Sequence, residues 1–180
     1  MNVPNLLSIF RLFITIFFIL AVYHDRLNYA LYLFILQGIT DLLDGFIARV
    51  FGLKTTLGAF LDPLADKTML IAAFVMLSFK NILPSWLLIL VLLRDMVIAG
   101  GFLFLYRLAR TVKPVPTILG KITTVSQIAV ILYFLWFVSG RFDAAFIYAA
   151  AFFTVISGCH YVLVGIRLLR SGKVDQSPAN

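Results

Sequence analysis

The sequence contains no glutamate, and only 13% of its 180 residues are charged. A soluble domain carries roughly 25% charged residues, so this composition excludes an ordinary soluble enzyme. Apolar side chains take the place of the missing charges and make up 62% of the chain. Several apolar runs reach the roughly 20 residues that cross a bilayer, and the length suits one domain. The sequence therefore predicts a polytopic membrane protein without a separate soluble catalytic domain.

Cysteine is almost absent as well. The single cysteine, Cys159, excludes an intramolecular disulfide and a cysteine-based metal site. Metal binding, if it occurs, must therefore use other side chains.

Hydropathy divides the chain into six spans joined by short polar connections. We expect helices, because backbone polar groups in lipid must be satisfied within the segment. The predicted fold is all-α with six transmembrane helices, forming one domain over residues 1–170 with a polar tail over 171–180. The predicted spans are Leu6–Tyr23, Leu27–Val50, Leu57–Phe79, Pro84–Tyr106, Ile118–Val138 and Phe142–Leu169.

The net charge of +7 does not indicate nucleic-acid binding, because the basic residues stand at the ends of the apolar spans. Such residues report topology, since cytoplasmic loops carry an excess of Lys and Arg. Nine basic residues follow the second and fourth spans or lie at the C-terminal end, against three in the opposite loops. Both termini, and the connection between the second and third spans, should face the cytoplasm.

Four of the eight aspartates lie close together across the second and third predicted spans. Asp41 and Asp44 are three residues apart and share one face of a helix. Asp62 and Asp66 are four residues apart and share another. A carboxylate near hydrocarbon is costly, which makes an intramembrane acid a functional-site hypothesis. If the two helices pair antiparallel, the four carboxylates converge at the cytoplasmic boundary.

Four carboxylates at that separation cannot all be ionised without a cation between them. Hard oxygen ligands select Mg²⁺, Mn²⁺ or Ca²⁺ over zinc. One or two such ions suit phosphate chemistry, in which metals neutralise developing charge. The alternative from spacing alone is a proton relay or cation pathway in a transporter. Transporters more often show broken helices or inverted repeats, and this sequence shows neither.

Small residues accompany the aspartates at Gly45, Ala48 and Gly58. They favour close helix packing, and they also leave room for a ligand against the backbone, so spacing alone does not separate the two interpretations. Arg49 lies one helical step from Gly45. Its guanidinium group either makes two hydrogen bonds to a phosphate, or it extends to the membrane surface and only marks the topology.

The whole pattern resembles the signature of the CDP-alcohol phosphatidyltransferases. The chain reads Asp-x2-Asp-Gly-x2-Ala-Arg-x8-Gly-x3-Asp-x3-Asp from Asp41 to Asp66, and every position of that signature matches. Enzymes of this family move a phosphatidyl group from CDP-diacylglycerol to an alcohol and release CMP. The resemblance covers essentially the whole chain. It implies one or two Mg²⁺ or Mn²⁺ ions, a homodimer, and a bacterial inner-membrane enzyme with a cytoplasmic active site.

The resemblance also implies roles for individual residues. The implied metal ligands are Asp41, Asp44 and Asp62, with Asp66 at the edge of the same shell. Asp66 is also the implied general base for the acceptor hydroxyl, and a carboxylate one turn from a metal ligand is well placed for that step. The residues implied to bind the CDP group are Asp41, Gly45, Ala48, Arg49 and Gly58.

The resemblance implies that the acceptor is a polar or lipid alcohol. The segment from Pro4 to Arg11 and the Gly120-Lys121-x-Thr123-Thr124 stretch resemble the phosphatidylglycerol branch of the family. Arg94 in the middle of the fourth span needs an anionic partner. Adjacent helix positions face apart, which makes its neighbour Asp95 a poor one. One interpretation of Arg94 is still a pair with Asp95 or a hydrogen bond that packs the helices, and the other is an anion pocket for a phosphate on the acceptor. We expect the second, in which Arg94 and Lys121 bind that phosphate.

Two acceptors fit this branch. The Arg94-Asp95 pair and Lys113-Pro114 lean toward CMP-forming cardiolipin synthases, and Phe102 stands where many glycerophosphate enzymes have an arginine. The wide distribution of phosphatidylglycerophosphate synthases favours sn-glycerol 3-phosphate, which ranks first, ahead of phosphatidylglycerol. Phosphatidylserine and inositol-phosphate acceptors rank third. A cation transporter and a non-catalytic scaffold are the alternatives from other classes.

Overall fold

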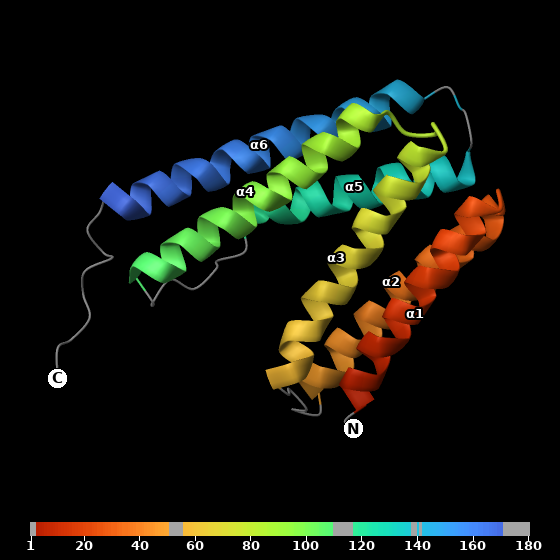
Figure 1. The fold of residues 1–180 in the computed structure, drawn as a ribbon, viewed down its shortest axis with the longest axis horizontal. Coiled ribbons are helices and arrows are strands. Elements are labelled where there is room, and N and C mark those ends of the chain that lie inside the picture. The colour runs from red at the N-terminus through yellow and green to blue at the C-terminus, as the bar shows by residue number, and fades with distance from the viewer. Residues whose placement is uncertain (1–2, 51–55, 110–116, 138–139, 141, 171–180) are drawn as a thin grey trace. The chain divides into compact units, whose positions relative to one another are not determined.

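A computed structural model describes residues 3–50, 56–109, 117–137, 140 and 142–170, with side chains for 10–41, 67–104, 107, 117–137, 140 and 142–167. These residues form six helices and no strand (Figure 1). The helices are α1 (Val3–Tyr23), α2 (Leu27–Val50), α3 (Thr56–Phe79), α4 (Ser85–Ala109), α5 (Ile118–Trp136) and α6 (Asp143–Arg170). Each predicted span matches one helix, with ends that differ by at most three residues, so the all-α prediction is confirmed.

Three helices in the described part of the chain are long and apolar enough to cross a membrane. Their apolar stretches are Ser85–Phe104, Ile118–Trp136 and Asp143–Arg167, and shorter ones are Phe10–Tyr23 and Lys67–Phe79. Large apolar side chains such as Phe17, Leu93 and Phe152 are exposed, which suits lipid and not water. The chain is therefore a helical membrane protein, and six complete crossings stay a prediction.

The chain divides into two compact units. The first comprises Met1–Ser85 and Ile131–Gly140, and the second comprises Trp86–Val130 and Arg141–Asn180. Helix α5 contributes to both units. A single catalytic domain over residues 1–170 stays a prediction.

In the first unit, α1 packs against both α2 and α3 (Figure 1). The rings of Phe18 in α1 and Phe34 in α2 lie 6.1 Å apart, and both side chains are buried. Their neighbours in the core are Ile14, Val22, Leu31, Met69, Phe74 and Leu77. This apolar core fixes how the three helices lie along one another, and it thereby positions the polar residues further along them.

Helices α1 and α3 end in the same kind of turn. Asp25 (φ 58) and Asn81 (φ 57) adopt the left-handed conformation, which Asp and Asn tolerate better than other residues with a side chain. In each turn the next residue, Arg26 or Ile82, donates its backbone N–H back to the last helical turn. Lys80 Nζ lies 2.7 Å from Asp25 Oδ1 and joins the two turns. The C-terminal ends of α1 and α3 are therefore adjacent, and these helices run parallel.

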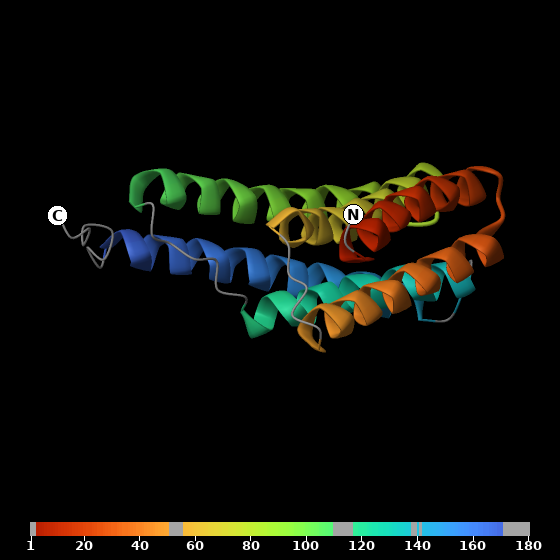
Figure 2. The ribbon, with the colours of Figure 1, turned by 90° about the horizontal axis from the view of Figure 1, so that it is seen from below.

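In the second unit, α4 lies over the layer that α5 and α6 form (Figure 2). Trp86 of α4 stacks on Tyr148 of α6 with ring centroids 6.2 Å apart. Gln127 Nε2 of α5 donates to Thr154 Oγ1 of α6 at 3.1 Å, and both residues are buried. Such interhelical hydrogen bonds contribute to helix association in lipid, where the hydrophobic effect does not act between helices.

Candidate functional site

The aspartates of the signature lie on two helices of the first unit. Asp41 and Asp44 are in the second half of α2, and Asp62 and Asp66 are in the first half of α3. Each pair therefore has the helical spacing that places it on one face. The side chains of Asp44, Asp62, Asp66, Gly45, Ala48, Arg49 and Gly58 lie outside the described residues. Their convergence and their roles stay predictions.

The direction of the two helices agrees with the metal hypothesis. Helix α1 runs parallel to α3, because the turns at Asp25 and Asn81 adjoin through Lys80. It runs antiparallel to α2, because a short turn joins them. Consequently α2 and α3 are antiparallel, and the aspartates of both helices lie toward the end opposite those turns.

Asp41 is bound by an arginine from α1. Arg11 Nη1 donates to Asp41 Oδ1 at 2.7 Å. The Arg11 side chain is 0% exposed, whereas that of Asp41 is 44% exposed. The cation therefore lies inside the helix bundle, and the carboxylate stays accessible. Sequence reasoning missed this pair, because no spacing rule links residues on two different helices.

The donor chemistry of this region fits a hard divalent cation, since all four candidate ligands are carboxylates. Asp41 can serve as such a ligand while it is paired with Arg11. Arg11 contacts Oδ1, and the half-exposed carboxylate has a second oxygen that can bind the cation. Within the described residues alone, no group of three or more His, Cys, Asp or Glu comes together. Three of the four aspartates lie outside the residues to which that statement applies.

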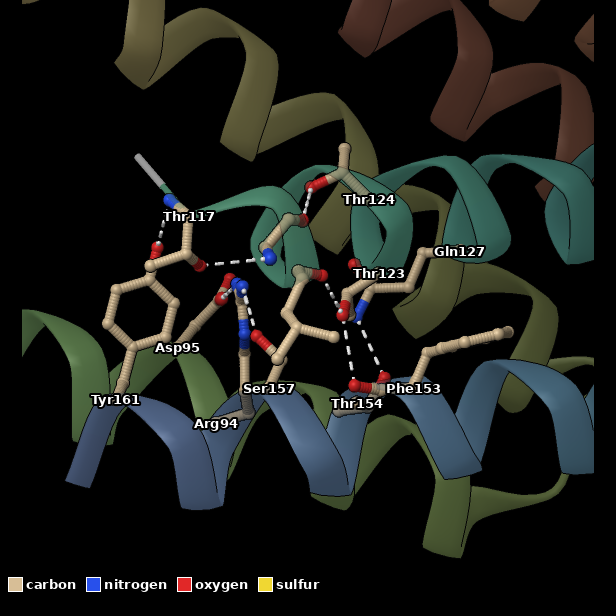
Figure 3. A network of polar contacts seen from close by, with 12 residues as sticks. Arg94, Asp95, Thr117, Thr123, Thr124, Gln127, Phe153, Thr154, Ser157 and Tyr161 are labelled. Carbon is tan, nitrogen blue, oxygen red and sulfur yellow. Dashed lines mark hydrogen bonds and ion pairs between the residues drawn. The ribbon is translucent and has the colours of Figure 1, made fainter. Parts of the chain in front are cut away.

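Arg94 and Lys121 line the same pocket in the second unit. The pocket has a volume of about 390 Å³. Three of its lining residues, Arg94, Thr117 and Tyr161, lie near the N-terminal end of α5 (Figure 3). The remaining lining residues are Gly120, Thr124 and Val125. Gly120 N–H donates to Thr117 Oγ1 at 3.1 Å, which makes Thr117 the N-cap of α5. The N-terminal end of a helix favours anions, and here two cationic side chains lie beside it.

The expectation that Asp95 is a poor partner for Arg94 was wrong. Arg94 Nη1 lies 2.7 Å from Asp95 Oδ1, and Nη2 donates to Ser157 Oγ of α6 at 3.1 Å. The helix does direct the two Cβ atoms apart, but the long arginine side chain bends back far enough to reach its neighbour. Arg94 Nε is buried and has no hydrogen-bond partner among the described residues. One donor of the guanidinium therefore remains unsatisfied beside the pocket.

Tyr161 and Gly120 shape the pocket. The Tyr161 hydroxyl accepts a hydrogen bond from Thr117 N–H at 3.4 Å, and the tyrosine ring centroid lies 5.8 Å from the Arg94 guanidinium. A Cβ atom at Gly120 would lie 3.0 Å from the Tyr161 hydroxyl oxygen, so glycine keeps this space open. Sequence analysis missed Tyr161, which lies on another helix far along the chain from both Arg94 and Gly120.

Comparison with known proteins agrees with the signature. The profile of the family described as CDP-alcohol phosphatidyltransferase matches residues 1–156. The CDP-diacylglycerol–glycerol-3-phosphate 3-phosphatidyltransferase of Bacillus subtilis (strain 168) is 39% identical over 135 residues, which cover 72% of this chain and 69% of that protein. A probable phosphatidylglycerophosphate synthase of Mycobacterium tuberculosis is 34% identical over 175 residues, which cover 92% and 82%.

A CMP-forming cardiolipin synthase of Rattus norvegicus is also similar. It is 35% identical over 146 residues, which cover 72% of this chain but 48% of that protein. Relatives with two different names are thus similar to the same chain. The chain belongs to the CDP-alcohol phosphatidyltransferase family.

Proposed function

We propose that this protein transfers the phosphatidyl group of CDP-diacylglycerol to sn-glycerol 3-phosphate and releases CMP, forming phosphatidylglycerophosphate. The observation that carries the proposal is the intact signature from Asp41 to Asp66, borne on two antiparallel helices. The names of the similar Bacillus subtilis and Mycobacterium tuberculosis proteins support sn-glycerol 3-phosphate as the acceptor.

The donor half of the reaction uses the aspartate region. The residues that would hold one or two Mg²⁺ or Mn²⁺ ions are Asp41, Asp44, Asp62 and Asp66. Bound there, the ions would neutralise the diphosphate and make CMP a better leaving group. Gly45, Ala48 and Gly58 give the nucleotide room beside the backbone, and Arg49 forks onto its phosphates.

Asp66 accepts the proton of the attacking acceptor hydroxyl. The hydroxyl oxygen forms the new bond to the phosphatidyl phosphorus as the bond to the CMP oxygen breaks. The diacyl chains stay in the bilayer throughout, which is why the enzyme is embedded in the membrane.

The acceptor half uses the pocket at the N-terminal end of α5. Arg94 and Lys121 contribute positive charge there, and the α5 N-terminus favours an anion. A phosphate monoester fits this chemistry. Asp95 already pairs with Arg94, so Lys121 carries the larger share of the uncompensated charge.

The bacterial relatives support an enzyme of a bacterial inner membrane. The distribution of basic residues supports placing both termini and the active site on the cytoplasmic side. CDP-diacylglycerol reaches the enzyme from the bilayer, and sn-glycerol 3-phosphate reaches it from the cytoplasm. A homodimer is part of the proposal, on the family resemblance alone.

A panel of acceptors tests the proposal. Purified protein with CDP-diacylglycerol and Mg²⁺ or Mn²⁺ is given sn-glycerol 3-phosphate, phosphatidylglycerol, serine or inositol phosphate, and the lipid products are identified by mass. We expect phosphatidylglycerophosphate and an equal amount of CMP. Cardiolipin as the main product would favour the second candidate, to which the similar rat protein and Phe102 point. No CMP with any acceptor would contradict the transferase assignment.

A further inference from the structure

We propose that Arg11 is a positioning residue for the metal site: it holds Oδ1 of Asp41 so that the other carboxylate oxygen is presented to the ion. The inference rests on the proposed function, in which Asp41 is a metal ligand. The signature that identifies the family begins at Asp41 and does not include Arg11, which lies on another helix.

Burial separates this arginine from a substrate-binding one. The Arg11 side chain is 0% exposed, so its guanidinium is not available to a substrate phosphate. A fully buried cation requires an anionic partner, and Arg11 Nη1 has one 2.7 Å away in Asp41 Oδ1. Asp41 is 44% exposed and can still bind an ion. The pair thus has one buried, fixed member and one accessible member.

The same interface continues along both helices with constant register. Arg11 meets Asp41, the Thr15 hydroxyl lies 3.4 Å from Gln37 Oε1, and the ring of Phe18 lies 6.1 Å from that of Phe34. Each step forward along α1 is matched by an equal step backward along α2, as antiparallel helices require. The packing of Phe18 on Phe34 therefore sets the height of Asp41 along the bundle, and Arg11 sets the orientation of its carboxylate.

Loss of Arg11 has two opposite effects on cation binding. It removes a positive charge beside the aspartates, which by itself would strengthen binding of a divalent cation. It also frees the Asp41 carboxylate to rotate, which weakens binding, because partners that orient a ligand are typically worth about 10–100-fold in metal affinity. The positioning role predicts that the second effect is larger.

Direct Mn²⁺ binding to the purified full-length protein, followed by electron paramagnetic resonance without lipid substrate, tests this. We expect Arg11→Met to raise the Mn²⁺ dissociation constant about 10-fold or more. Arg11→Lys should lie between Arg11→Met and the unmodified protein, because lysine keeps the charge but not the planar fork. Gln37→Leu is the matched control: it changes the same α1–α2 interface one turn away and should leave Mn²⁺ binding within about twofold.

Several results would overturn the inference. Unchanged or tighter Mn²⁺ binding by folded Arg11→Met would show that charge outweighs positioning. Equal weakening in Gln37→Leu would reduce Arg11 to a helix-packing role. If Arg11→Met does not fold, Arg11→Lys decides, and unmodified affinity there contradicts the proposal. Asp41→Asn serves a different purpose, since undiminished Mn²⁺ binding by that variant would contradict the proposed role of Asp41 itself.

Discussion

Arg94 is a charged residue in the middle of an apolar helix, and its contacts define a test at the scale of one side chain. Replacement by alanine removes the guanidinium from the pocket while Lys121 remains. We expect Arg94→Ala to raise the apparent KM for the phosphorylated acceptor about 10-fold or more and to leave that for CDP-diacylglycerol nearly unchanged. Steady-state kinetics with each substrate varied in turn measures both. Arg107→Ala is the control, because this exposed arginine lies on the same helix outside the pocket.

A defect of Arg94→Ala that follows the donor would contradict the acceptor assignment. If Arg94→Ala loses thermal stability but keeps its KM values, Arg94 has a structural role. Its contacts with Asp95 and Ser157 are compatible with such a role.

Substitution of Gly120 tests the same pocket in a second way, because an added side chain fills part of it. The added methyl group of Gly120→Ala would lie 3.0 Å from the Tyr161 hydroxyl oxygen and 3.3 Å from Thr117 Oγ1, so it takes up space that the acceptor needs. We expect a raised acceptor KM, partly restored when Tyr161→Phe removes the hydroxyl. Gly101→Ala is the control, because nothing lies within 4 Å of its Cβ position. Equal kinetics for the Gly120 and Gly101 variants would show that this pocket does not bind the acceptor.

Asp66 is the proposed general base. Asp66→Asn keeps the shape of the side chain but cannot accept the hydroxyl proton. Turnover should fall by about 10² or more while CDP-diacylglycerol and Mn²⁺ binding largely persist. Single-turnover CMP release measures the chemical step, and equilibrium Mn²⁺ binding measures whether the metal site is intact. Turnover near that of the unmodified enzyme would remove Asp66 from the chemistry.

At this scale the sequence predicted residue types and local spacings but not partners across helices. The aspartates, Arg94 and Lys121 were identified because each is a charge in an apolar segment. The Arg11–Asp41 pair was missed because it joins positions on separate helices. The Arg94–Asp95 pair was judged wrongly because backbone direction does not fix where a long side chain ends.

The helices themselves were predictable, since each apolar run is bounded by polar turn residues. The two tight turns in the first unit show why the ends fall where they do. Asn81 has φ 57, a conformation that disfavours residues with a branched Cβ. Asn81→Val should lower the free energy of unfolding by about 1–2 kcal/mol, whereas Asn81→Gly should leave it equal or higher. Thermal unfolding in detergent measures both, with Asn28→Ala on the exposed side of α2 as a control.

If Asn81→Val were as stable as the unmodified protein, the turn would not terminate α3 in the way described. The packing of α1 on α3 could not be predicted from the sequence, because it depends on how buried side chains of each helix, such as Phe18 and Phe74, fit together. Periodicity identifies which face of a helix is apolar, but it does not identify the neighbour.

At the scale of the whole molecule, the distribution of charge predicts orientation in the membrane. Nine basic residues stand on the predicted cytoplasmic side and three on the other. One of those three, Lys80, is paired with Asp25, which lowers the positive charge of that side further. The turns that carry Asp25 and Lys80 should therefore face outward, and the opposite ends of α2 and α3, with their aspartates, should face the cytoplasm.

Cysteine accessibility in intact cells tests this orientation, because Cys159 is the only native cysteine. In a Cys159→Ser background, Asn28→Cys beside the outward turn should react with a membrane-impermeant maleimide added outside. Gln176→Cys in the C-terminal tail should react only after the membrane is opened. The reverse pattern would place the aspartates on the outer side, away from cytoplasmic sn-glycerol 3-phosphate. The orientation and the proposed acceptor would then be incompatible, although the donor chemistry of the aspartates would be unaffected.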